Sequence, residues 1–150
     1  MTKASDLKAH DIFSSLSLEG VQKVNDISEV RQFKAGQIIY QPGQATDNLY
    51  ILLEGSVALR LTKDKESSTA GIFQVEKGEL FGAGALLGTP RYFRQAYCVT
   101  KAKVLAINGK KFLKIIEDDK IVGFDVMTKI AQAYHDRYNV LTDKIQSIFA

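Results

Sequence analysis

The sequence predicts a single, mainly β domain of the sandwich or small-barrel, jelly-roll type, with one helical segment before the strands and another after them. Its 150 residues, 45% hydrophobic and 25% charged, have the size and composition of one ordinary globular domain. Short β-branched and aromatic segments separated by glycine fill the middle of the chain, whereas both ends show helical spacing of apolar residues. We expect one domain over residues 1–150, helical over 1–30, β-sheet over 31–107 and helical again over 108–150.

The N-terminal zone, from Leu7 to about Val30, is predicted to be helical. Ser17 is a suitable N-cap for the stretch after it, because its hydroxyl can accept a hydrogen bond from a free backbone N–H. Apolar residues then recur every three positions, which puts them on one side of a helix. These residues are Leu18, Val21, Val24 and Ile27.

The central zone is predicted to consist of short strands joined by turns. The strands are QIIY, NLYILLEG, SVALRLT, GIFQVEKG and KVLAI, with turns near Pro42-Gly43, Glu54-Gly55 and Lys77-Gly78. In the third strand, Val57, Leu59 and Leu61 alternate with other residues, as in a strand with one buried face. Many short strands at this spacing favour a jelly-roll type of sandwich or barrel.

The C-terminal zone is predicted to hold a short helix over Lys111–Asp118, a break at Gly123 and a long helix to the end. Apolar and aromatic residues along the long helix alternate steps of four and three, as in a heptad seam. They are Met127, Ala131, Tyr134, Tyr138, Leu141, Ile145 and Ile148. The pattern favours a homodimer through this helix. Packing against the chain's own barrel, which gives a similar but wider stripe, is the alternative.

Several function classes lack support in the sequence. A net charge of +3 with no basic block gives no case for nucleic acid, and nothing after Ile148 suits a helix-turn-helix, so no direct nucleic-acid contact is expected. No membrane-length apolar run or signal-peptide core occurs, and the single Cys98 suits a reducing compartment, so a cytoplasmic protein without a membrane is expected. His10 and His135 lie far apart and no G-x-S-x-G motif occurs, so neither a metal site nor an enzyme is expected.

The stretch LFGAGALLGTPRYFRQA, from Leu80 to Ala96, is the candidate binding loop. Its glycines allow the backbone N–H groups to approach an anion closely, and Ala85-Leu86-Leu87 can start a short helix. Arg91 could add a charge-assisted contact to the same anion. The stretch is not a Walker loop, because no Gly-Lys-Ser/Thr follows, and it is not a dinucleotide fingerprint, because helices and strands do not alternate around it.

The order of elements resembles the cyclic nucleotide-binding domain family over nearly the whole chain. FKAGQIIYQPGQATDNLYILLEGSVAL is similar to the family's opening pattern AG..I...G...D..Y.....G.V. The matching residues are Ala35, Gly36, Ile39, Gly43, Asp47, Tyr50, Gly55 and Val57. The long helix resembles the catabolite activator group in particular. The resemblance implies a β-roll with an N-terminal helical segment and a long C-terminal helix.

The candidate binding loop resembles the family's phosphate-binding cassette, F-G-E-(L/I)-A-L-L followed by P-R-A-A. The matching residues are Phe81, Gly82, Ala85, Leu86, Leu87, Pro90 and Arg91. The resemblance implies that Arg91 pairs with the cyclic phosphate and that the base lies against Phe73, Val75, Arg137 and Thr142. The full set of expected ligand-binding residues is Gly82, Ala83, Gly84, Ala85, Arg91, Tyr92, Phe73, Val75, Arg137 and Thr142.

The cassette departs from the family pattern at three points. Ala83 stands where the family has the glutamate that holds the ribose 2′-hydroxyl, and Tyr92-Phe93 replace a pair of small residues. The segment from Gly82 to Arg91 is also one residue short, which makes Arg94 an alternative phosphate ligand.

The resemblance implies a regulatory, non-enzymatic domain that binds a 3′,5′-cyclic purine nucleotide, cyclic AMP in preference to cyclic GMP, and no other cofactor. It would relay binding through the long helix to a dimer partner or to an effector domain after residue 150. The alternative, favoured by Ala83, is a degenerate β-roll that binds no nucleotide and serves as a dimerisation module.

Overall fold

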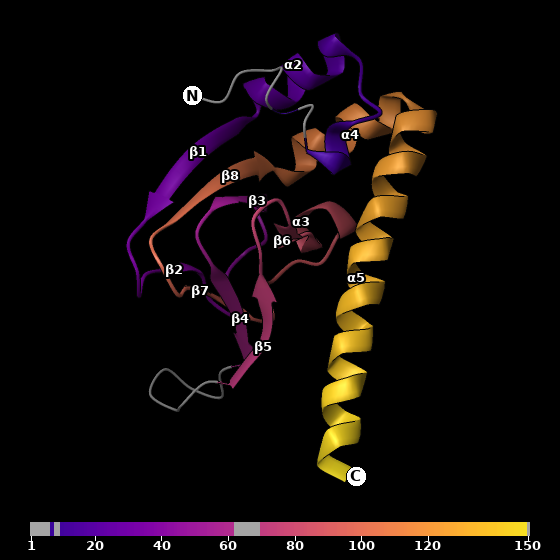
Figure 1. The fold of residues 1–150 in the computed structure, drawn as a ribbon. Helices are drawn as coiled ribbons and strands as arrows, with labels where there is room; N and C mark the ends of the chain where they lie inside the picture. The colour runs from indigo at the N-terminus through magenta and orange to yellow at the C-terminus, as the bar shows by residue number, and fades with distance from the viewer. Residues whose placement is uncertain (1–6, 8–9, 62–69, 150) are drawn as a thin grey trace.

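The protein is a β-roll of two four-stranded antiparallel sheets, with short helices at one end and one long helix along its side (Figure 1). The computed structural model describes residue 7, residues 10–61 and residues 70–149. The strand orders are β1-β8-β3-β6 in one sheet and β2-β7-β4-β5 in the other. The predicted fold class is confirmed.

The elements follow one another in the predicted order of helices, strands and helices. Their bounds are η1 (Asp11–Phe13), α2 (Leu18–Asp26), β1 (Ser28–Phe33), β2 (Ile38–Tyr40), β3 (Asn48–Glu54), β4 (Val57–Leu61), β5 (Ala70–Val75), β6 (Leu80–Phe81), α3 (Gly84–Leu87), β7 (Gln95–Cys98), β8 (Ala102–Asn108), α4 (Gly109–Asp118) and α5 (Lys120–Phe149). Thr62 and Ala150, the last residues of two predicted elements, lie outside the described residues. The predicted N-cap is confirmed, because the Ser17 hydroxyl accepts a hydrogen bond from the Gly20 N–H at 3.1 Å.

Three strands are absent from the sequence prediction: β1, β7 and the two-residue β6, which pairs with β3. β1 begins at Ser28, within the zone predicted to be helical, and pairs along its whole length with β8, where Val30 lies opposite Leu105. β7 begins at the end of the candidate binding loop, at Gln95, and pairs with both β2 and β4. These strands depend on pairing with distant segments, so local periodicity does not reveal them.

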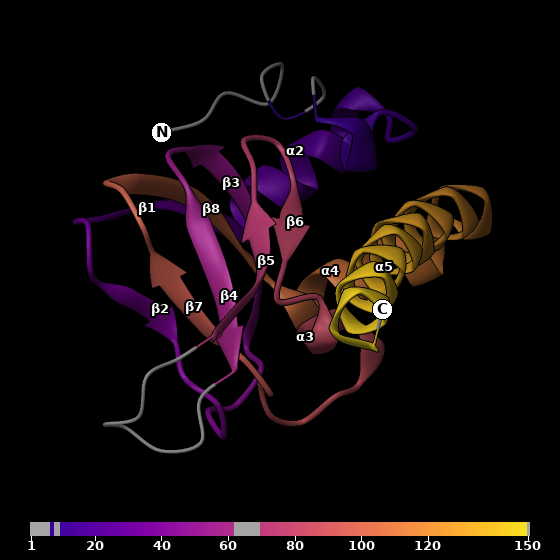
Figure 2. The same cartoon turned by 60° about the horizontal axis from the view of Figure 1, so that its bottom comes forward.

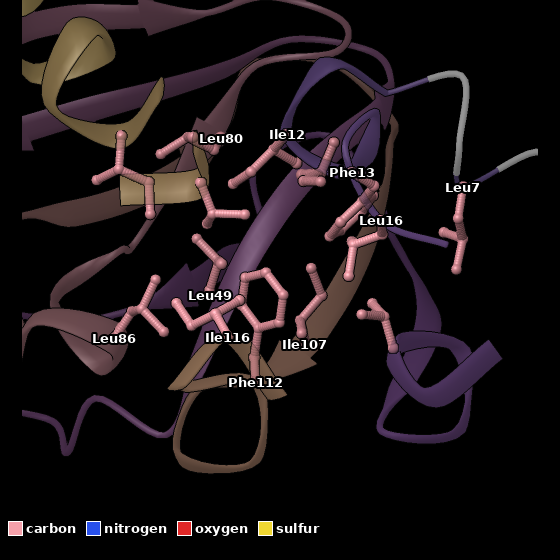
Figure 3. Packing of buried hydrophobic residues seen from close by; sticks show 14 of the residues in the cluster. Leu7, Ile12, Phe13, Leu16, Leu49, Leu80, Leu86, Ile107, Phe112 and Ile116 are labelled. Carbon is pink, nitrogen blue, oxygen red and sulfur yellow. The ribbon is translucent and has the colours of Figure 1, made fainter. Parts of the chain in front are cut away.

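Two apolar cores fill the molecule. One lies between the sheets and includes Leu52, Val57 and Val104, all fully buried. The other joins the first sheet to the helices, where Phe13 of η1 meets Phe112 of α4 edge to face at 5.9 Å between ring centroids (Figure 3). This second core fixes the N-terminal and C-terminal helices to the same end of the roll.

The predicted helix break at Gly123 is wrong, because α5 runs through this residue and the break lies at Asp119. The Asp119 carboxylate accepts hydrogen bonds from the N–H groups of Ile121 and Val122, both at 3.2 Å, which starts α5. A Cβ at position 123 would lie 2.5 Å from the carbonyl oxygen of Ile116. The glycine therefore permits close packing of α5 on α4 instead of ending a helix.

The long helix α5 packs on the molecule with its N-terminal half and extends past the roll with its C-terminal turns (Figures 1 and 2). Val122, Val126 and Ile130 are buried at successive steps of four. The predicted seam is divided: three of its residues pack against the chain's own cores, and others are exposed. Met127, Tyr134 and Leu141 pack inward, whereas Tyr138, Ile145 and Ile148 are exposed. In the described residues, no helix has the length and apolar character needed to cross a membrane.

Candidate ligand-binding cavity

A cavity of about 700 Å³ lies between the β-roll and α5. Its walls come from strands β2, β4 and β5, from the candidate binding loop (residues 80–96, the cassette loop) around α3, and from one side of α5. The lining residues are Tyr40, Thr46, Leu59, Phe73, Gly82, Gly84, Leu87, Thr89, Arg91, Tyr92, Phe93, Arg94, Ala131, Tyr134, His135, Arg137, Tyr138 and Leu141. A cavity of this size can hold a small organic ligand.

The cassette loop is fixed by its own backbone and by the segment that precedes β3. Gly82 has φ +72°, and a Cβ there would lie 3.2 Å from the ring of Tyr50 and 3.3 Å from the ring of Tyr40. Glycine is therefore required both by conformation and by space. Further along, the Thr46 N–H donates to the Pro90 carbonyl at 3.2 Å, and the Thr46 hydroxyl donates to the Thr89 carbonyl. The loop includes the predicted short helix, observed as α3.

Arg91 and Arg94 have different surroundings, although both line the cavity. Arg91 is exposed, and its Nη1 donates to the carbonyl oxygen of Gly43 at 3.1 Å. Arg94 is half-buried, and its guanidinium carbon lies 5.6 Å from the ring centroid of Phe73. Arg91 is thus attached to the rim, whereas Arg94 lies over an inner wall.

Arg137 brings a guanidinium from α5 to the same cavity. It donates to the carbonyl oxygen of Leu80 on β6, and its guanidinium carbon lies 5.8 Å from the ring centroid of Tyr134. Burial lowers the pKa of Arg137, and the positive charge of Arg94 contributes to the same shift. The two guanidinium groups are therefore close enough for their charges to interact inside one partly buried site.

Stacked tyrosines form the floor of the cavity. The rings of Tyr40 and Tyr92 stack with centroids 3.8 Å apart and planes 11° from parallel. The Tyr92 hydroxyl donates to the carbonyl oxygen of Asn48 at 2.6 Å. Burial raises the pKa of both tyrosines, so their hydroxyls stay protonated and neutral at physiological pH.

The structure brings together six of the ten residues predicted from the sequence, together with Arg94, which the sequence offered as the alternative phosphate ligand. The six that line the cavity are Phe73, Gly82, Gly84, Arg91, Tyr92 and Arg137. Ala83 is fully buried in the core beneath the helices, and Val75 is fully buried between the sheets. Ala85 lies against Gly109, and the Thr142 hydroxyl donates to the Asn139 carbonyl outside the lining.

Some residues of the cavity wall were not among the ligand-binding residues predicted from the sequence. Tyr40 is predicted only as a strand residue. Tyr134, Tyr138 and Leu141 are predicted as part of a dimer seam, with packing on the chain's own barrel as the alternative. Their aromatic and apolar character was visible in the sequence, but their approach to the cassette depends on α5 lying along the roll. Among the residues that the structure describes, no group of three His, Cys, Asp or Glu side chains could hold a metal ion.

Residues 30–119 match the family described as the cyclic nucleotide-binding domain. A protein of Geobacter metallireducens GS-15 described as cyclic nucleotide-binding is 30% identical to this chain. The two structures superpose with a TM-score of 0.78, over 92% of this chain and 99% of the other. The chain therefore belongs to the cyclic nucleotide-binding domain family, as the cassette and the order of its elements indicated.

Two further relatives are more distant. The catabolite activator protein of Thermus thermophilus shares the fold, with a TM-score of 0.70 and 22% identity over 91% of this chain and 63% of its own. The cGMP-dependent protein kinase egl-4 of Caenorhabditis briggsae is 26% identical over 110 residues, which make up 71% of this chain. The chain spans 14% of the length of that kinase.

Proposed function

We propose that the chain is a regulatory module that binds a 3′,5′-cyclic purine nucleotide between the roll and α5 and catalyses no reaction. The observation that carries this proposal is the meeting of aromatic walls with the guanidinium groups of Arg94 and Arg137 in one cavity. A cyclic phosphate is an anion, which the guanidinium groups can bind. A purine has a flat aromatic face, which can stack on the aromatic walls. Membership of the family supports the same class of ligand.

Within this proposal, Arg94 is the principal phosphate ligand and Arg91 is the alternative. The guanidinium of Arg91 is exposed and already donates to Gly43, whereas that of Arg94 lies by the Phe73 ring, and no polar group of the described residues competes for its N–H groups. Arg137 lies across the cavity and supplies a second positive charge to the ligand. Phe73 and Tyr134, the rings next to these guanidiniums, are the surfaces proposed for the base.

Relay through a dimer is the second part of the proposal. The exposed apolar residues Tyr138, Ile145 and Ile148 continue at heptad steps along α5 where it extends past the roll, which suits a second copy of this chain. In such a dimer, Thr142 of one copy would serve the base bound by the other, and its hydroxyl suits either purine. Cyclic AMP is the preferred ligand over cyclic GMP. The module would act in the cytoplasm on an effector domain, without contacting nucleic acid or a membrane itself.

A β-roll that binds no nucleotide is the competing function, and one observation favours it. The buried Tyr92 ring stacks on Tyr40 at 3.8 Å on the cavity floor, where the family pattern has a small residue. A ligand that needs this space would have to displace a ring held by the bond to Asn48. Under this alternative, the α5 surface and its partner copy would be the whole function.

The test is calorimetric titration of unfolded and refolded protein with cyclic AMP and with cyclic GMP, because refolding removes any ligand that co-purifies. We expect saturable binding that Arg94→Gln weakens by about 10- to 150-fold, the loss of one hydrogen bond to a charged group. Arg60→Gln is the matched control, since Arg60 also lies over a ring, that of Tyr97, but outside the cavity. Greater loss in Arg91→Gln than in Arg94→Gln would restore Arg91 to the phosphate role. No heat up to millimolar nucleotide would favour the competing function.

A further inference from the structure

The cavity has an unusual chemical composition for a site that holds a sugar. In the part of the chain that the structure describes, its lining side chains carry aromatic, aliphatic, hydroxyl, guanidinium or imidazole groups, and none carries a carboxylate or an amide. A sugar hydroxyl that leaves water needs an acceptor for its proton, and ionised carboxylates make the strongest such hydrogen bonds. The cavity therefore has strong partners for an anion and for a ring, but not for a hydroxyl donor.

Two of the lining hydroxyls are already engaged within the protein. The Tyr92 hydroxyl donates to the Asn48 carbonyl at 2.6 Å and accepts from the Asn48 N–H at 3.4 Å. The Thr46 hydroxyl donates to the Thr89 carbonyl on the cassette side. These bonds hold the cassette loop against the start of β3 and fix the direction of both hydroxyls. A sugar hydroxyl could reach only the neutral oxygen lone pairs of these groups, which are weaker acceptors than a carboxylate.

The start of the cassette is also apolar where it borders the cavity. Gly82 lies against the rings of Tyr40 and Tyr50, at the distances given above for a Cβ. The next residue, Ala83, is fully buried, and its methyl group belongs to the core beneath the helices. Where it borders the cavity, this segment thus offers the backbone of Gly82 beside the ring of Tyr40, and no polar side chain of its own.

We propose that this cavity holds a cyclic purine nucleotide by its base and its phosphate alone and does not recognise the ribose 2′-hydroxyl. Ring walls at Phe73 and Tyr134 and the guanidiniums of Arg94 and Arg137 supply the contacts to those two groups. The ligand class of the site therefore includes 2′-deoxy cyclic nucleotides on equal terms with their ribose forms. This inference rests on the proposed function, because it concerns the ligand of the same cavity.

The experiment compares cyclic AMP with 2′-deoxy cyclic AMP, which differ only in the 2′-hydroxyl, by titration of the refolded protein and of Arg94→Gln. We expect the two dissociation constants to agree within threefold in the unaltered chain. Arg94→Gln should weaken both ligands by the same factor, since both would place a phosphate at the same guanidinium. Arg60→Gln, altered outside the cavity, should leave both dissociation constants unchanged.

The outcomes separate the inference from the proposed function. Tight binding of cyclic AMP with a tenfold or greater loss for the 2′-deoxy form would overturn the inference and leave the proposed function intact. A variant effect confined to one of the two ligands would overturn it as well, because the two would then occupy different sites. If neither ligand binds, the proposed function fails, and the inference fails with it.

Discussion

Gly55 occupies a turn in which both backbone conformation and space exclude a side chain. Its φ is +93°, and a Cβ there would lie 2.2 Å from the Lys101 carbonyl oxygen and 2.9 Å from the Ala102 Cα. Gly78 has nearly the same φ, +89°, but open space around it. We expect Gly78→Ala to lower the free energy of unfolding by about 1–2 kcal/mol, the cost of left-handed backbone for a residue with a Cβ. Gly55→Ala should lower the free energy of unfolding by at least about 2 kcal/mol more than Gly78→Ala, because the backbone at Lys101 and Ala102 must move to make room for the Cβ. Urea denaturation of both variants measures the difference, and equal losses would contradict the steric argument.

His10 introduces a pH dependence of stability at the N-terminal end. Its ring meets Phe13 edge to face at 6.4 Å between centroids, and burial lowers its pKa below the ordinary value of 6.5. Between the two pKa values the unfolded chain binds more protons than the folded one, so acidification through this range destabilises the protein. We expect the unfolding midpoint in urea to fall more between pH 7.5 and pH 5.5 in the unaltered chain than in His10→Gln. The same pH dependence in both proteins would refute the assignment.

At the scale of elements, the contact between α4 and α5 depends on Gly123. Glycine inside a helix usually costs about 0.5–1 kcal/mol relative to alanine, so Gly→Ala is usually stabilising there. Gly123→Ala should instead lower the free energy of unfolding by about 1–3 kcal/mol, because the new Cβ would meet the Ile116 carbonyl oxygen. Gly20→Ala in α2 is the matched control and should be near neutral, since its nearest neighbour is the flexible end of the Leu16 side chain at 2.9 Å. Thermal unfolding of both variants provides the measurement, and a more stable Gly123→Ala would contradict the packing argument.

The elements also show how far the sequence determines the fold. Strands with buried alternation, such as β4, and a capped helix such as α2 were predictable, because local pattern and final environment agree. β1 was hidden because none of its residues is fully buried and the helical spacing of α2 continues up to it. In the site, sequence alone left Arg91 and Arg94 as alternatives. Their orientations depend on the pairing of the loop with residues 43–46 and on the position of α5, which are long-range features.

At the scale of the whole molecule, the proposed dimer can be tested by the mass of the protein in solution. Ile148 and Ile121 are both exposed on α5, at 75% and 83%, but only Ile148 belongs to the predicted seam. We expect the unaltered chain to sediment as a dimer and Ile148→Glu to shift it towards monomer, because a buried unpaired carboxylate opposes association. Ile121→Glu should remain dimeric, and circular dichroism should be unchanged in both variants. A monomeric unaltered chain, or equal effects of the two variants, would contradict dimerisation through the seam.

Ligand binding should also be visible in the stability of the whole molecule. A ligand that binds only the folded state adds about 2.7 kcal/mol of stability at one hundred times its dissociation constant. For a chain of this length, that corresponds to a rise of about 5–10 °C in melting temperature. Cyclic AMP should produce this rise in the unaltered chain and in Arg60→Gln, and Arg94→Gln should lose most of it at the same nucleotide concentration. Because a ligand shifts an equilibrium only by its differential affinity for the two states, a rise that survives in Arg94→Gln would mean that Arg94 is not the phosphate ligand.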